Sequence, residues 1–153
     1  MPDLALPSSA QMRFTVRPAV IADVPAMHGI RMRVRENRLA DPGRITEASY
    51  LPFVAGAAAW VADTGVELLG FAAADQATSS VWALFVAPEA EGRGVGRELH
   101  AAIIQWARQL GLPRLSLSTA GGSRAERFYQ QADWRRIGLT PDGETAFQID
   151  PRA

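Results

Sequence analysis

Three glycines at alternate positions, Gly92, Gly94 and Gly96, lie between a short β-prone run and a stretch with helical periodicity. Glycine lets the backbone approach a ligand closely, and the amides that open a helix are unpaired donors at the positive end of its dipole. Arg93 and Arg97 add positive charge to the same segment. These residue types in this order favour binding of an anion, and a phosphate group in particular.

Two well-known phosphate-binding loops require residues that this segment lacks. A P-loop ends in Gly-Lys-Ser or Gly-Lys-Thr, and the chain contains no Lys. A dinucleotide fingerprint, GxGxxG, requires a third glycine where this sequence has Arg97 or Leu99. Both are therefore excluded. A tight strand-to-helix turn without a ligand remains open, because a glycine pattern alone is a weak signal.

The composition limits the class of protein. A chain of 153 residues can bury one core as one domain. The absence of Cys and Lys excludes disulfides, thiolate metal sites, a Cys nucleophile and a Lys Schiff base. Sixteen basic residues balance sixteen acidic ones, so no overall field favours nucleic acid or an anionic membrane. No apolar run approaches the ~20 residues that span a bilayer, and we expect a soluble, cytoplasmic protein.

The elements that position the glycine loop follow from periodicity and turn residues. Val95, Leu99, Ile103, Trp106 and Leu110 recur at helical spacing, and Gly111 ends that helix. Alternation and β-branched runs predict strands, with Gly and Pro between them. We expect a flexible tail at 1–11, a turn at 41–43, helices at 23–37, 46–56, 95–110 and 123–132, and strands at 13–17, 60–62, 66–74, 80–86, 115–118, 134–137 and 145–149.

Two segments together resemble a known family. Leu84-Phe85-Val86-Ala87-Pro88 followed by GRGVGR is similar to the phosphate-binding motif of the GNAT superfamily of acyl-CoA N-acyltransferases. The segment 125–134, AERFYQQADW, resembles the second motif of that family, at the expected separation. The resemblance implies an α/β (α+β) fold: a single domain at 12–153 with a mixed, mostly antiparallel sheet of about six or seven strands and helices on both faces.

The resemblance also implies roles for individual residues. Backbone groups of the strand would pair with the pantetheine arm of acetyl-CoA, and the loop would receive its pyrophosphate. Tyr129 would protonate or hydrogen-bond the departing thiolate, although a core aromatic is the open alternative. The cofactor-binding residues implied in this way are Leu84, Phe85, Val86, Gly92, Arg93, Gly94, Val95, Gly96 and Arg97.

The chain departs from the family pattern at three positions. Glu91 stands where Gln or Arg is usual, and we expect it to turn to solvent or to pair with Arg93. Gly122 replaces an Asn that contacts the cofactor, so Ser123 or Arg124 is expected to take that contact. Asp133 replaces the helix-ending Gly, which is tolerable because Asp enters the left-handed region more readily than most residues.

The sequence leaves the general base and the acceptor open. The position that carries a Glu on the fifth strand of some relatives is Leu117. Other candidate bases are Glu36, Glu47 and Asp75. An ordinary surface carboxylate is the alternative interpretation for each of them. Three arginines expected on one helical face could attract an acidic acceptor or simply be solvated: Arg31, Arg35 and Arg38.

The remaining aromatic and histidine side chains carry weaker indications. Trp60 and Trp82 could line an acceptor cleft, but strand aromatics are more often part of the core. His28 and His100 lie on separate predicted helices without a nearby second ligand. We expect them at the helix surface, and we expect no metal site.

The leading hypothesis is an N-acetyltransferase that moves the acetyl group of acetyl-CoA to a primary amine of a small molecule or peptide. Because no Cys is present, direct attack in a ternary complex is the economical route. The alternative is a CoA-binding sensor or interaction module with the same fold. A homodimer is left open.

Overall fold

The computed structural model describes residues 13–34 and 45–153. Several predicted features lie outside these residues: the tail at 1–11, the turn at 41–43, and the side chains of Arg35, Glu36 and Arg38. None of the described helices combines the length and the apolarity that crossing a bilayer would require.

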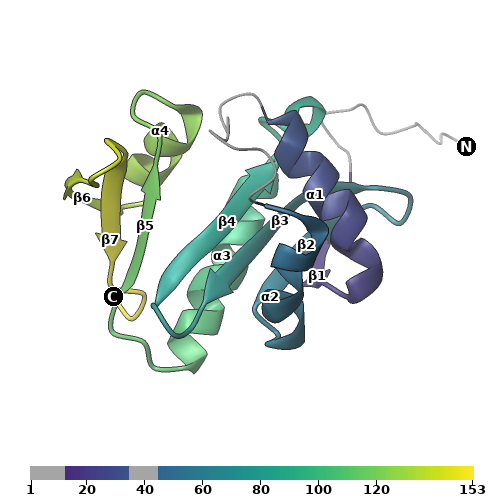
Figure 1. Ribbon diagram of the computed structural model, residues 1–153, viewed down its shortest axis with the longest axis horizontal. Coiled ribbons are helices and arrows are strands. Elements are labelled where there is room, and N and C mark those ends of the chain that lie inside the picture. The colour runs from purple at the N-terminus through teal and green to yellow at the C-terminus, as the bar shows by residue number, and fades with distance from the viewer. Residues whose placement is uncertain (1–12, 35–44) are drawn as a thin grey trace, which may run out of the picture.

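A seven-stranded sheet forms the centre of the molecule, with the strand order β1-β2-β3-β4-β5-β7-β6 (Figure 1). Every neighbouring pair is antiparallel except β4 and β5, which are parallel. This confirms the predicted mixed, mostly antiparallel sheet. The strands are β1 (Thr15–Pro18), β2 (Ala59–Asp63), β3 (Leu68–Asp75), β4 (Ser80–Val86), β5 (Leu115–Thr119), β6 (Arg135–Leu139) and β7 (Thr145–Ile149).

Helices cover both faces of the sheet, as predicted. Successive residues of a strand point to opposite faces. A side chain at Gly70 of β3 would meet Leu99, whereas the neighbouring Phe71 packs its ring against Tyr50 on the other face. The helix at 95–109 therefore covers the face toward which Gly70 points, and the segments around the helices at 24–33 and 51–55 cover the opposite face. The helices are α1 (Val24–Arg33), α2 (Leu51–Ala55), α3 (Val95–Gln109) and α4 (Arg124–Gln131).

The first helix is shorter than predicted. The periodicity suggested a helix to Asn37, but α1 ends at Arg33 because Val34 has an extended backbone, with φ −77° and ψ 113°. A β-branched residue loses side-chain freedom in a helix, so an ending at Val34 is physically reasonable. Arg31 lies on α1, whereas Arg35 and Arg38, which were expected on the same helical face, lie outside the described residues.

The helix that follows the glycine loop is anchored by a fully buried stripe. Val95, Leu99, Ile103 and Ala107 each expose 1% or less of their surface. Leu110, which the sequence placed on the same face, is exposed, because Gly111 has φ 71° and ends the helix there. Burial of these four side chains removes their apolar surface from water, which fixes α3 against the sheet and hence fixes the loop at its N-terminus.

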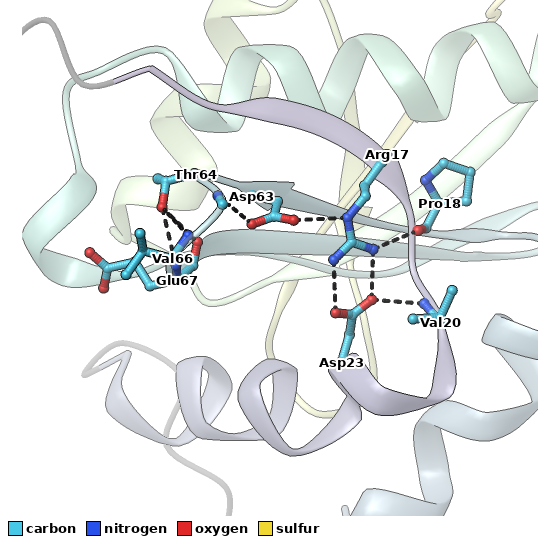
Figure 2. A network of polar contacts seen from close by, with 9 residues as sticks. Arg17, Pro18, Val20, Asp23, Asp63, Thr64, Val66 and Glu67 are labelled. Carbon is cyan, nitrogen blue, oxygen red and sulfur yellow. Dashed lines mark hydrogen bonds and ion pairs between the residues drawn. The ribbon is translucent and has the colours of Figure 1, made fainter.

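A charged network holds β1 and the start of α1 to the sheet (Figure 2). Arg17 of β1 donates from Nε to Asp63 at 3.0 Å, and from both terminal nitrogens to Asp23 at 2.9 and 3.0 Å. Asp23 also accepts the backbone N–H of Val20 at 2.8 Å. The hydrogen bonds from Arg17 hold the pKa of Asp23 below its usual value. The network fixes the edge strand, which also tolerates Pro18 as its last residue.

Candidate functional site

The sheet splits between its two parallel strands. Strand β4 pairs with β3 from Val86 to Ser80, but it pairs with β5 only at Ser80, opposite Ser116. Beyond that point the two strands separate (Figure 1). The β5-facing edge of β4 is therefore left without a partner strand among the described residues. Unpaired backbone donors and acceptors on such an edge can hold an extended ligand as an added strand would.

A cavity of about 520 Å³ occupies this split. This volume falls in the range of ordinary ligand pockets. Its lining comes from both faces of the sheet. Arg31 of α1 and Val34, the residue after α1, line it on one face, whereas Gly96 of α3 and Phe128 of α4 line it on the other. Of the predicted cofactor-binding residues, those that line it are Leu84, Phe85, Val86, Gly92, Gly94, Val95, Gly96, Arg97 and Ser123. Arg93 is half-buried and lies outside that lining.

The glycine loop presents backbone donors to the cavity. Gly92 and Gly94 have φ values of 80° and 85°, a left-handed conformation that glycine adopts without strain. Gly94 is the N-cap of α3, and the first internal bond of the helix runs from Glu98 N to Gly94 O at 3.1 Å. The N–H groups of the first turn, Val95 to Arg97, therefore have no partner within the helix. Unpaired N–H groups of this kind can bind an anion, which is the role that the sequence predicts for the loop.

A glycine that the sequence analysis did not single out allows this close approach. A Cβ atom at Gly70 would lie 2.7 Å from the carbonyl oxygen of Phe85 and 3.1 Å from side-chain atoms of Val95 and Leu99. The absence of a side chain at Gly70 thus lets the first turns of α3 press directly onto β3 and β4. Sequence pattern could not reveal this contact, because Gly70 reads as an ordinary strand residue.

Tyr129 is both a core residue and part of the cavity wall. It is 5% exposed, and its ring packs against Phe128, Trp134 and Phe147. It also lines the cavity between β5 and α4. Burial raises the pKa of its phenol well above the usual value, so the hydroxyl remains protonated at neutral pH. The side chain can therefore serve as a proton donor to a ligand in the cavity.

The start of α4 is held by its own cap. Ser123 Oγ accepts the N–H of Glu126 at 3.1 Å and donates to the carbonyl of Ala120 at 2.6 Å. The hydroxyl that was expected to replace a cofactor contact is therefore committed to the helix N-terminus. At the other end of α4, Asp133 has φ 71°. It occupies the left-handed region, as predicted for the residue that replaces the usual Gly.

The carboxylate of Glu91 pairs with an arginine of α4. Its Oε1 lies 3.5 Å from Nη2 of Arg124, a partner that the sequence analysis did not foresee. The guanidinium partly neutralises the negative charge beside the loop. Glu91 therefore opposes an anion less than its position in the sequence suggested.

The carboxylates that reach the cavity differ from those proposed as bases. Glu47 is exposed, and Asp75 borders a separate hollow beside Phe53. Leu117 does line the cavity, as an apolar residue. Glu144 was not considered, but it lines the cavity and accepts a hydrogen bond from Ser118 Oγ at 2.8 Å.

The position of Glu144 depends on a long-range pairing of strands. Glu144 follows the turn at Asp142 and Gly143, between the strands predicted at 134–137 and 145–149. Pairing of Thr145 with Thr119 then brings it beside the end of β5. A hairpin turn gives no indication of which third strand it will lie against.

An aromatic cluster surrounds Arg31 on the α1 side of the cavity. Its guanidinium lies 4.5 Å from the ring centre of Trp82, 4.9 Å from Phe85 and 5.8 Å from Tyr50. Trp82 is the extra residue of a β-bulge, where β4 slips by one residue against β3. The hydroxyl of Tyr50 is 2.9 Å from Nδ1 of His28. Trp82 thus lines the cavity, whereas the ring of Trp60 packs on Trp106 of α3.

Both histidines are half-buried, so the expectation of surface positions is wrong. His100 accepts the indole N–H of Trp134 at 2.9 Å, and burial lowers its pKa. His28 is held by Tyr50. Among residues 13–34 and 45–153, no group of three or more His, Cys, Asp or Glu side chains is arranged to hold a metal ion.

The residues of the cavity suit a long ligand with an anionic end. The loop supplies backbone donors for phosphates, the free edge of β4 supplies donors and acceptors for an extended amide-containing arm, and the split leads on to the opposite face. Coenzyme A has a pyrophosphate and an amide-containing arm in that order, so the residues fit it.

Solved structures with the same fold include several acetyltransferases. The PaiA N-acetyltransferase of Thermoplasma acidophilum, in complex with coenzyme A, has a TM-score of 0.79 at 11% identity over 91% of this chain and 99% of that chain. YncA of Salmonella typhimurium, a putative acetyltransferase with its cofactor acetyl-CoA, gives 0.74 at 18% identity, with 91% and 94% covered. The ribosomal-protein-S18-alanine N-acetyltransferase of Escherichia coli gives 0.69 at 19%, with 89% and 91% covered.

These identities are low, and they show a shared fold. Family membership comes from the sequence itself, because a model of the acetyltransferase (GNAT) family matches residues 27–134, well over half of the chain. The matched region includes α3, the glycine loop and α4. This chain therefore belongs to the acetyltransferase (GNAT) family.

Proposed function

We propose that the protein is an acetyl-CoA-dependent N-acetyltransferase that modifies a primary amine of a small molecule or peptide by direct attack in a ternary complex. The observation that carries this proposal is the cavity through the split sheet. It joins the anion-binding N-terminus of α3 on one face to the α1 side on the other. Two ligands can therefore meet within the sheet, one from each face.

The cofactor end of the site is formed by the loop and by β4. The amides of Val95 to Arg97 and the side chain of Arg97 would bind the pyrophosphate. Backbone groups of Leu84 to Val86, free on the β5 side, would hold the pantetheine arm as an added strand. Arg124, paired with Glu91 beside the loop, offsets the negative charge of that carboxylate.

The reacting end would use Tyr129 and Glu144. Acetyl-CoA supplies the acetyl group, so that a C–N bond to the amine forms as the C–S bond breaks and the sulfur leaves as a thiolate. Tyr129 would donate its phenolic proton to that sulfur. Glu144, a carboxylate in the cavity wall, is our candidate for accepting the proton that the amine loses. Backbone amides of β4 would polarise the carbonyl.

A CoA-binding sensor or interaction module remains the second candidate. Two observations favour it: a carboxylate, Glu91, stands at the loop, and the hydroxyl of Ser123 is used as a helix cap. Such a module would bind CoA and would not turn it over. Catalysis and binding must therefore be measured separately.

The test combines calorimetric titration of CoA with release of free CoA from acetyl-CoA in the presence of polyamines, amino acids, aminoglycosides and peptides. Binding together with amine-dependent release supports the enzyme. Binding without release by any amine favours the module, and no heat from CoA would overturn both. Arg97→Gln should weaken CoA binding by about five-fold, as expected for one partly exposed charged contact. Arg135→Gln, an exposed residue of β6 away from the loop, is the matched control and should leave binding unchanged.

A further inference from the structure

Arg31 lines the cavity from α1, on the side of the sheet opposite to α3. It belongs to α1, and its guanidinium covers Phe85 on the sheet face opposite to α3. The cavity reaches it through the split between β4 and β5. A ligand held by the loop and by β4 would therefore share this cavity with Arg31, and a second ligand could approach from the α1 side.

The charge of Arg31 is buried, and no described carboxylate pairs with it. The residue is 5% exposed; its guanidinium interacts with the Tyr50 hydroxyl, but its Nε–H has no hydrogen-bond partner among the described residues. Within the part of the chain that the structure describes, every ion pair within 4 Å involves other residues. An arginine does not lose its proton in such a place. A buried cation without an anion is costly, so its presence beside a cavity requires an explanation.

The aromatic rings around Arg31 offset only part of this cost. Trp82, Phe85 and Tyr50 contact the guanidinium through their faces, and such contacts stabilise a cation modestly. They also hold the planar guanidinium against the sheet, where Arg31 forms part of the cavity wall. A guanidinium presented in this way matches the geometry of a carboxylate.

We propose that Arg31 binds a carboxylate of the acceptor, so that the substrates are amino acids or similarly small amines with a carboxylate close to the nitrogen. This rests on the acetyltransferase function proposed above. Phe85, which Arg31 covers, belongs to the β4 segment expected to hold the pantetheine arm. Amine and carboxylate must therefore be separated by few bonds. The carboxylate takes no part in the reaction and keeps its charge.

The direct test compares each protein amino acid with its own amide, which has the same size and amine but no negative charge. Free CoA release from acetyl-CoA is measured for both. For the acids that are used, kcat/KM should exceed that of the amide by about 10- to 100-fold, the value of a hydrogen-bonded ion pair in a buried site. Equal use of acids and amides by the wild-type protein would overturn the proposal.

The variants assign the effect to Arg31. In Arg31→Gln the ratio of kcat/KM for the acid to kcat/KM for its amide should fall close to one. Arg31→Lys should keep only part of the preference for acids, because the ammonium lacks the planar fork of donors. Arg33→Gln, on the same helix but exposed and paired with Glu89, is the matched control and should keep the wild-type ratio. A wild-type ratio in Arg31→Gln would contradict the proposal. Should Arg31→Gln not fold, the acid and amide comparison in the wild type decides alone.

A binding measurement separates this proposal from the function on which it rests. Amino acids and their amides are titrated into CoA-loaded protein by calorimetry, which requires no turnover. Preference for acids without CoA release by any amine would refute the enzyme and support Arg31 as a carboxylate site. Amine-dependent release with no preference for acids, in either assay, would support the enzyme and refute the role of Arg31.

Discussion

Replacing Tyr129 by Phe removes one hydroxyl from the cavity wall and leaves the ring contacts with Phe128, Trp134 and Phe147 in place. No protein partner of that hydroxyl is found in the described regions, so the variant should lose less than about 1 kcal/mol in the free energy of unfolding. Tyr50→Phe is the stability control. It breaks the bond to His28 and should cost about 1 kcal/mol.

The expected effect of Tyr129→Phe on the reaction follows from its surroundings. General acids contribute roughly 100- to 10,000-fold to a rate. Burial raises the pKa of this phenol, which makes it a reluctant donor and places it at the lower end of that range. We expect the chemical step to slow by about 100-fold, or about 2.7 kcal/mol. CoA affinity should not change, because the phosphate contacts lie on the loop.

The assay is a single turnover with saturating acetyl-CoA and acceptor, so that slow product release cannot hide the chemical step. Because its raised pKa keeps Tyr129 protonated, the wild-type rate should increase with pH as the amine becomes neutral and should show no loss below about pH 10. An unchanged single-turnover rate in Tyr129→Phe would refute its role as the acid. The residue would then be a core aromatic only.

Three further variants test the framework and the base. Asp23→Asn should lower the free energy of unfolding by about 1–2 kcal/mol at pH 7, as measured by urea denaturation. Because Arg17 holds the pKa of Asp23 low, this difference between wild type and variant should be complete above about pH 4 and should shrink as the pH falls below that value. Gly70→Ala should cost about 1–3 kcal/mol and weaken CoA binding, because the new methyl displaces the start of α3. Glu144→Gln should lower kcat/KM about 10- to 100-fold at pH 7 and less at pH 10, where free amines need no base.

Each of these has its own control. Asp150→Asn removes an exposed ion pair and should leave stability unchanged, so an equal loss in both variants would contradict the role of the Arg17 network. Gly29→Ala fills open space on α1 and should stabilise the protein slightly. Normal stability in Gly70→Ala would contradict the close packing of α3. A full rate at pH 7 in Glu144→Gln would exclude it as the base.

The order and type of the elements were accessible from the sequence because they depend on neighbours along the chain. Side-chain periods of two and 3.6 residues distinguish strands from helices, and Gly and Pro mark their ends. The spacing of Gly92, Gly94 and Gly96 likewise predicts a loop between a strand and a helix, and in the structure Gly92 and Gly94 take positive φ just before α3. The end of α1 at Arg33 was missed, because the apolar periodicity continues to Val34.

Only the tertiary structure decided what these elements enclose. The split between β4 and β5 depends on a parallel pairing of residues on either side of a whole helix. The position of Glu144 depends on the pairing of Thr145 with Thr119, and the burial of Arg31 on how α1 packs over Trp82. Contacts between residues far apart in the chain leave no local pattern, because they arise from the joint packing of all the elements. The sequence by itself determined a loop that can hold an anion, whereas the fold determined that the cavity beside it passes through the sheet to a buried positive charge.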